Sequence, residues 1–216
     1  TAYAFTVDPS VPCGSQLAFA LTVNYSGVGT HPTVIAFSLP TGRLDTVPTT
    51  LFSYAGAPVA IPDGDTTGVD IPFVIAATQP IGKLTFSLDG SACSADAGST
   101  TVGLDHTWVG DVSLTLTSPA GTAVSLADRI GGPSNSGNNL CQTVLSDDAT
   151  TSIETVAVSS APYTGTFKPN GALSAFSGQN PAGTWVLHAT DSVFIDSGSV
   201  RAFSIEASSF SCSATP

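Results

Sequence analysis

Residues 104–122 read LDHTWVGDVSLTLTSPAGT, and this stretch decides the fold. Its second half alternates between apolar and hydroxyl-bearing side chains, with Val112, Leu114 and Leu116 on one side and Ser113, Thr115 and Thr117 on the other. A period of two is typical of a β-strand with one buried face. Pro119 and Gly121 follow, and both favour the dihedral angles of a tight turn. The pattern predicts a half-buried strand that ends in a turn.

Polar and aromatic side chains stand directly before this strand. They are Asp105, His106, Trp108 and Asp111. Carboxylate and imidazole groups can bind cations or transfer protons. We therefore expect a site at the point where the strand begins.

The composition favours an all-β protein. The 216 residues include 21 Gly, 15 Pro, no Met and two glutamates, Glu154 and Glu206. Strong helix formers are scarce, whereas residues that favour strands and turns are abundant. A chain of this length can bury a substantial core as one large or two small domains.

The charge excludes two classes of partner. Aspartate and glutamate number 16 against five lysines and arginines, which gives a net charge of −11. Such a surface repels nucleic-acid phosphates and anionic membranes, and it attracts divalent cations. No apolar run is long enough to span a bilayer. We expect neither nucleic acid nor a membrane as a partner.

Three motifs, in this order, resemble the P domain (homo B domain) of proprotein convertases and of secreted bacterial subtilisin-like serine proteases. They are HTWVGDVSLTLTSPAGT at residues 106–122, PAGTWVLHATD at residues 181–191 and SGSVRAFSIEA at residues 197–207. The resemblance covers about residues 50–212, a normal length for one domain. The sequence departs from the family at Val112, where leucine is usual, and at residues 91–101, which we interpret as an insertion.

The resemblance implies a jelly-roll-like β-sandwich with additional N-terminal strands. It also implies a non-catalytic accessory domain that lies after the protease catalytic domain of the same secreted precursor. Such a domain would stabilise its protease and tune its folding and calcium dependence. The residues agree with a lack of catalysis, because the chain has no G-x-S-x-G elbow and no subtilisin-type G-T-S motif. We expect His106 to be structural and the protein to be a monomer.

The same motifs suggest a Ca²⁺ site. Asp111, Asp147, Asp148 and Asp191 each lie at a strand end or in a loop of the matching motifs, and we expect them to converge. Neighbouring carboxylates repel each other unless a cation lies between them. Oxygen ligands without thiolate or imidazole favour calcium over zinc. For Asp147 and Asp148, a pair that caps a helix is the alternative interpretation.

A second acidic segment is less suited to calcium. Residues 61–70 read IPDGDTTGVD and resemble the start of an EF-hand loop at Asp63 and Asp65. The twelfth position of that loop needs a bidentate acid, and Val74 stands there. We interpret the segment as an exposed turn.

The N-terminal part divides from the rest. Leu17, Phe19, Leu21 and Val23 share one face of a predicted strand, and Ile35, Phe37 and Leu39 share a face of the next. Two strands cannot form a stable free-standing domain. Residues 1–48 are therefore predicted to be the C-terminal part of a preceding β-sandwich-like module, or accessory strands, and residues 49–216 to be the P domain.

Four cysteines complete the framework. Their spacing fits no zinc site, and an even count in a secreted β protein suggests two disulfides with three possible connectivities. We favour Cys93 with Cys141 and Cys13 with Cys212. Four buried free thiols are the alternative.

The main alternative function is an extracellular substrate-targeting or adhesion module. It would bind an extracellular protein or a polysaccharide through exposed aromatic side chains, for which Tyr163, Phe167 and Phe176 are candidates. We favour core positions for these three residues. A spacer in a long surface protein is a third possibility.

Two local expectations complete the prediction, a strand at residues 153–158 and a flexible surface loop at residues 128–139.

Overall fold

The computed structural model describes residues 4–25, 32–44 and 49–211. Strands dominate, and within these ranges no helix is long and apolar enough to cross a membrane. The helical elements are the short 3₁₀ turns η1 (Val109–Asp111), η2 (Ile153–Thr155), η3 (Val158–Ser160) and η4 (Leu173–Phe176).

The smaller sheet has four antiparallel strands in the order β10, β9, β13 and β6. Their bounds are Ala123–Asp128 for β10, Val112–Thr117 for β9, Gly183–Asp191 for β13 and Val69–Ile75 for β6. The alternating apolar side chains of β9 and β13 are buried, namely Val112, Leu114, Leu116, Trp185, Leu187 and Ala189. The predicted period of two is confirmed for both strands.

The larger sheet has the strand order β3, β15, β7, β11, β8, β14 and β5. Their bounds are Arg43–Leu44, Phe203–Ser211, Ile81–Leu88, Leu140–Leu145, Leu104–His106, Gly198–Val200 and Val59–Ile61. β4 (Thr50–Ser53) pairs with β15, and β12 (Tyr163–Phe167) runs parallel to β11.

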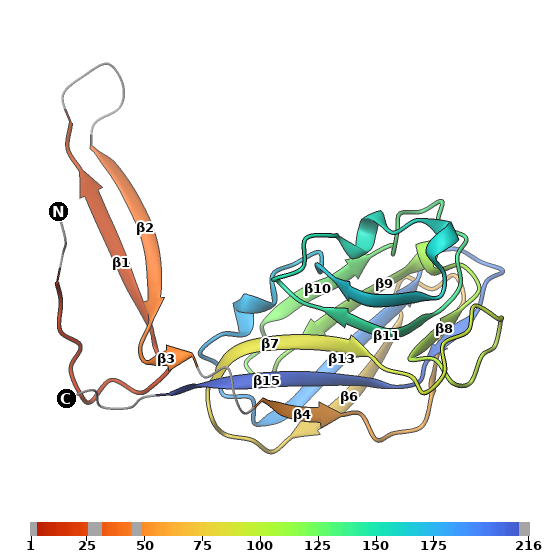
Figure 1. The fold of residues 1–216 in the computed structure, drawn as a ribbon, viewed down its shortest axis with the longest axis horizontal. Coiled ribbons are helices and arrows are strands. Elements are labelled where there is room, and N and C mark those ends of the chain that lie inside the picture. The colour runs from red at the N-terminus through yellow and green to blue at the C-terminus, as the bar shows by residue number, and fades with distance from the viewer. Residues whose placement is uncertain (1–3, 26–31, 45–48, 212–216) are drawn as a thin grey trace.

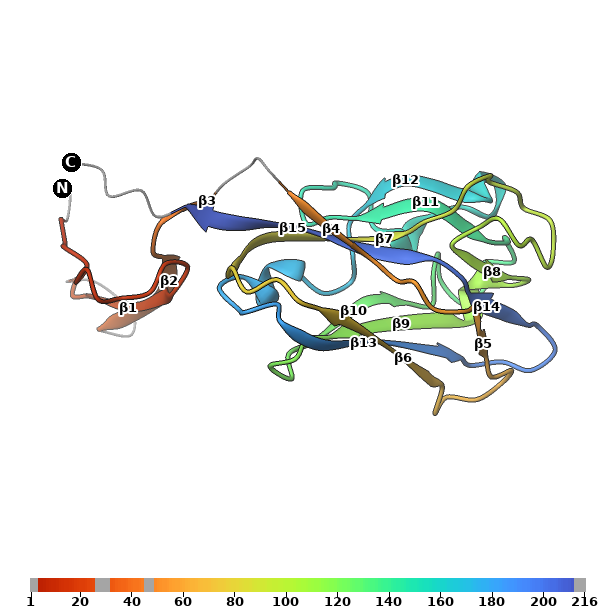
Figure 2. The same cartoon turned by 90° about the horizontal axis from the view of Figure 1, so that it is seen from below.

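Aromatic side chains join the two sheets in the core. Phe203 on β15 meets the ring edge of Phe73 on β6, with the ring centroids 5.1 Å apart, and stacks on Tyr54 at 4.7 Å. Figure 2 shows the two sheets as separate layers, with β7, β11 and β15 in one and β6, β9 and β13 in the other. The predicted all-β sandwich is confirmed.

The strands β1 (Gln16–Val23) and β2 (Thr33–Pro40) form a two-stranded sheet of their own, which projects from the sandwich (Figure 1). Every residue of β2 is exposed. On the apolar face of the hairpin, Phe19 of β1 stacks on Phe37 of β2 with the ring centroids 5.3 Å apart. The hairpin therefore stands outside the core of the sandwich, and its assignment to a preceding module stays a prediction.

Two local expectations are wrong. Residues 153–158 form no strand, because the buried side chains of Ile153 and Val156 hold η2 and the residue after it against the sandwich, while Val158 at the start of η3 is exposed. Residues 128–139 lie only partly on the surface, with Pro133, Ser134 and Ser136 exposed. Ile130, Asn135 and Asn139 are buried there, because the glycines of this segment let it turn inward and fill the end of the sandwich.

One of the two predicted disulfides lies in the described part of the chain. Cys93 and Cys141 form a bridge with a Cα separation of 5.4 Å, as predicted. It closes residues 91–101 against β11. The second predicted bridge involves Cys212, which lies outside the described residues.

The position of the hairpin gives a test of the domain division. We expect Phe37→Thr to change the free energy of unfolding of the sandwich by less than about 0.5 kcal/mol, because this side chain lies outside the core. Leu114→Ala is the matched core variant and should cost about 2–5 kcal/mol. Chemical denaturation followed by tryptophan fluorescence measures both. A loss of more than about 1 kcal/mol with Phe37→Thr would show that the hairpin belongs to the same cooperative unit.

Candidate functional site

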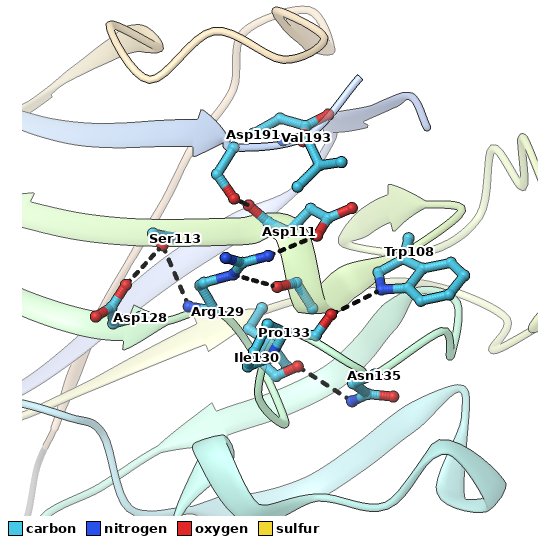
Figure 3. A network of polar contacts seen from close by, with 12 residues as sticks. Trp108, Asp111, Ser113, Asp128, Arg129, Ile130, Pro133, Asn135, Asp191 and Val193 are labelled. Atoms are coloured by element: carbon cyan, nitrogen blue, oxygen red, sulfur yellow. Dashed lines mark hydrogen bonds and ion pairs between the residues drawn. The ribbon is translucent and has the colours of Figure 1, made fainter. Parts of the chain in front are cut away.

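Polar side chains from four segments meet where β9 begins. They come from β8, from η1, from the chain after β10 and from the end of β13. Figure 3 shows Asp111, Arg129 and Asp191 from the last three of these segments. Core strands position them, because β8 is itself buried, η1 leads directly into β9, and the other two segments lie at the ends of β10 and β13. This end of the sandwich is the site expected before the strand at Val112.

Asp111 and Arg129 form the first ion pair of the site. The guanidinium Nη2 donates to the carboxylate of Asp111 at 3.0 Å, and its Nε donates to the carbonyl oxygen of Gly110 at 2.9 Å. Burial raises the pKa of Asp111, Arg129 lowers it, and the nearby charges of Asp191 and Asp196 raise it again. Arg129 thus supplies positive charge to a place where carboxylates gather.

His106 and Asp191 form a second pair, and both side chains are fully buried. His106 Nε2 lies 3.1 Å from Asp191 Oδ2, and His106 Nδ1 accepts a hydrogen bond from the backbone N–H of Trp108 at 3.1 Å. Since Nδ1 accepts a hydrogen bond, Nε2 carries the hydrogen of the neutral ring. Nε2 therefore donates the hydrogen bond to the carboxylate of Asp191. Both ring nitrogens are therefore engaged, and His106 holds β8 against the end of β13.

Asn139 connects this pair to the disulfide-closed loop. Its side-chain oxygen accepts from the backbone N–H of His106 at 3.0 Å, and its side-chain nitrogen donates to the carbonyl oxygens of Ser94 and Asp96, both at 2.8 Å. The backbone of Asn139 has φ of 66°, a conformation that asparagine tolerates better than most residues. No local sequence pattern connects Asn139 to residues 94–96, so the sequence alone did not identify it.

The four predicted calcium ligands occupy two separate places. Asp111 and Asp191 lie near each other in the site (Figure 3). Asp147 and Asp148 lie beside a different hollow, which Lys83 and Leu173 also line. The predicted convergence of all four is therefore wrong, because the fold places the loop after β11 beside η4 and not beside η1.

Protein donors already engage these carboxylates. Asp147 accepts from the backbone N–H groups of Leu173 and Ser174, at 2.9 and 2.8 Å, and so caps the turn η4. Asp148 forms an exposed ion pair with Lys83. Among the described residues, no group of three or more His, Cys, Asp or Glu side chains could hold a metal ion. The four aspartates do not fit a single calcium site.

An exposed apolar tip borders the site and was missed in the sequence. Val193, Phe194 and Ile195 follow Asp191, and their exposed fractions are 43%, 70% and 92%. With Trp108 and Pro133 they border a hollow of about 310 Å³. Three consecutive large apolar residues between two aspartates in a loop are the signal that could have identified them, because loops are usually polar.

The aromatic residues considered for substrate targeting lie inside the protein. Tyr163 and Phe176 are fully buried, and Phe176 meets the edge of Trp185 with the ring centroids 5.1 Å apart. The Tyr163 hydroxyl donates to the side-chain oxygen of Asn135 at 2.6 Å. Phe167 is partly buried against the core. The expectation that these residues fill the core is confirmed.

Comparison with known proteins agrees with the motifs. The family model described as proprotein convertase P-domain matches residues 96–207, which is more than half of the chain. No curated protein sequence matches significantly.

Solved structures also show similarity. The crystal structure of a serine protease of Aeromonas sobria has 16% identity and a TM-score of 0.45 over 79% of this chain and 28% of that chain. The complex of the Aeromonas sobria serine protease with its chaperone ORF2 has 14% identity and a TM-score of 0.43 over 89% of this chain and 36% of that chain. This chain therefore spans about a third of the length of either neighbour.

The Asp111–Arg129 pair is partly buried and the Asp148–Lys83 pair is exposed, which gives a matched test. We expect Arg129→Gln to lower the free energy of unfolding by about 1–3 kcal/mol, because it leaves the buried carboxylate of Asp111 without its charged partner. Lys83→Gln breaks the exposed pair with Asp148 and should cost less than about 1 kcal/mol. Adding Asp111→Asn to Arg129→Gln should recover part of the loss. Equal effects of the two single variants in urea denaturation would contradict this assignment.

Proposed function

This chain belongs to the proprotein convertase P-domain family, and we propose that it acts as the non-catalytic accessory domain of a secreted subtilisin-like serine protease. P domains are non-catalytic domains of proteases. The family match over residues 96–207 is the observation that carries the proposal, since it spans η1, β9, β13 and most of β15.

The structure supports a stabilising role better than a chemical one. The His106 imidazole has partners at both nitrogens and cannot serve as a general base without breaking them. The core, by contrast, is continuous between the two sheets. A domain that binds the folded form of a protease and not the unfolded form stabilises it by mass action.

The disulfide supports an extracellular location. Cys93 and Cys141 are bridged, and such bridges form and persist in oxidising compartments. The bridge also orders the loop that Asn139 holds. We propose secretion together with the protease domain as parts of one precursor.

Deletion of the domain tests the proposed function. In the complete precursor, we expect removal of residues 49–216 to lower the melting temperature of the catalytic domain by several degrees and to shorten its half-life during heating. Differential scanning calorimetry and hydrolysis of a peptide substrate measure these changes. The proposal fails if the precursor encodes no serine protease, or if deletion leaves stability and folded yield unchanged.

Calcium linkage was an expectation from the family motifs, and the proposed function does not include it. Because protein groups already engage the four aspartates, we expect the melting temperature of this chain to differ by less than about 2 °C between millimolar calcium and chelator. Calorimetry without reducing agent makes the measurement. A shift of about 5 °C or more would show a stabilising metal site and would restore the calcium hypothesis.

A further inference from the structure

We propose that the apolar tip formed by Val193, Phe194 and Ile195 is the surface through which this domain docks onto its protease catalytic domain. The inference rests on the proposed function and adds to it the position and the chemistry of the contact. The tip lies in the connection between β13 and β14, at the end of the sandwich away from the β1–β2 hairpin (Figures 1 and 2).

The exposure of the tip is the first argument. Ile195 is 92% and Phe194 is 70% exposed, although transfer of large apolar side chains out of water is favourable. Single exposed apolar residues are common on proteins, whereas contiguous apolar patches mark interaction sites. Three such residues in a row, next to the hollow bordered by Trp108 and Pro133, form one patch.

Hydrogen bonds on both sides hold the tip in place. The N–H of Val193 donates to the carboxylate of Asp191 at 3.1 Å, and the N–H of Ile195 donates to the carboxylate of Asp63 at 3.0 Å. Further along, the hydroxyl of Thr107 donates to the carboxylate of Asp196 at 2.8 Å. A loop that is already ordered loses less entropy on binding, so its apolar area contributes more to affinity.

The backbone of Ile195 is strained, which is the second argument. Its φ is 100°, a region that a β-branched residue rarely adopts. Strain of this kind persists where the surroundings impose it, and it clusters at functional sites. Here the strained residue is also the most exposed of the large apolar residues in the described chain. A glycine would relieve the strain but would remove the apolar side chain.

Acidic groups around the tip indicate the chemistry of the partner. The turn at residues 62–65 lies against the tip, since a Cβ atom at Gly64 would clash with the ring of Phe194. This contact brings Asp63 and Asp65 beside the tip, and Asp196 follows it directly in the chain. Protein interfaces combine an apolar centre with a polar rim of complementary charge. The partner surface should therefore be an apolar pocket with basic side chains around it.

The same acidic rim argues against a membrane as the occupant. A net charge of −11 repels anionic lipid headgroups, and carboxylates at the rim would lose hydration if the tip inserted. A folded protein surface with basic side chains gains from the same carboxylates. We therefore assign the tip to a protein partner, and lipid contact becomes an outcome of the test.

Photo-crosslinking in the complete precursor tests the proposal. Phe194→p-benzoylphenylalanine places the reactive group at the tip, and Val74→p-benzoylphenylalanine is the control on a strand whose side chain is 76% exposed. Mass spectrometry of peptides after irradiation should show crosslinks from position 194, but not from position 74, to the catalytic domain.

Each other outcome has a distinct meaning. Crosslinks to the catalytic domain from position 74 alone would overturn the docking surface and leave the proposed function intact. Crosslinks from neither position, in a precursor that deletion of the domain does not destabilise, would overturn both. Crosslinks from position 194 to lipid would overturn the protein partner.

A double variant adds a functional measurement. Phe194→Ser with Ile195→Ser should leave the melting temperature of this 216-residue chain unchanged, because both side chains are exposed. In the precursor, the same variant should speed thermal inactivation of the protease about fivefold or more, since contact between the two domains is lost. Unchanged inactivation would overturn the proposal, whereas Val74→Ser should change neither property.

Discussion

The buried pair of His106 and Asp191 is the interaction on which this end of the molecule depends. His106 ends a strand of the larger sheet, and Asp191 ends a strand of the smaller one, so their contact joins the two layers. A buried carboxylate without a partner costs several kcal/mol, which makes this contact obligatory once the sheets close. The second oxygen of Asp191 accepts from the N–H of Val193, so the group that joins the sheets also sets the direction of the loop that follows.

The exposed tip is a consequence of this arrangement. The backbone N–H of Ser192 donates to the carbonyl oxygen of Asp111 at 3.0 Å, and the first residue after the pair is thereby fixed against η1. The chain then has to cross to Asp63 before it returns to β14, and this short path leaves Phe194 and Ile195 facing solvent. Polar residues would satisfy the path equally well. The apolar character of the tip is therefore not required by the fold, which is the physical reason to look for its role in binding.

Sequence patterns predicted the elements that depend on contacts between residues close together in the chain. The alternation in β9 and β13 depends on residues two apart, and the motifs that contain these strands also identified the family. The bridge between Cys93 and Cys141 was predicted as well. The candidate site was predicted only in part, because its contacts join residues far apart in the chain. His106 and Asp191 are 85 positions apart, and Asp147 reaches η4 across 26 positions. A periodic pattern cannot predict contacts between residues so far apart in the chain. Asp147 was therefore predicted to lie beside Asp111 and Asp191, whereas it contacts η4.

The excess of acidic residues explains why a metal ion was expected. In the structure, basic side chains neutralise the buried carboxylates instead. A large excess of aspartate implies that something positive must lie among the carboxylates that are buried. Two of the five basic residues take that role, Arg129 at Asp111 and Arg201 at Asp105, while Lys83 pairs with the exposed Asp148. Two of these pairs flank the site, where desolvation makes an unpaired charge most costly. These three basic residues are thereby used inside the domain, and no Lys or Arg of the described residues forms an ion pair with the carboxylates around the tip. A partner that covers the tip must bring its own positive charge, and this requirement makes the contact selective.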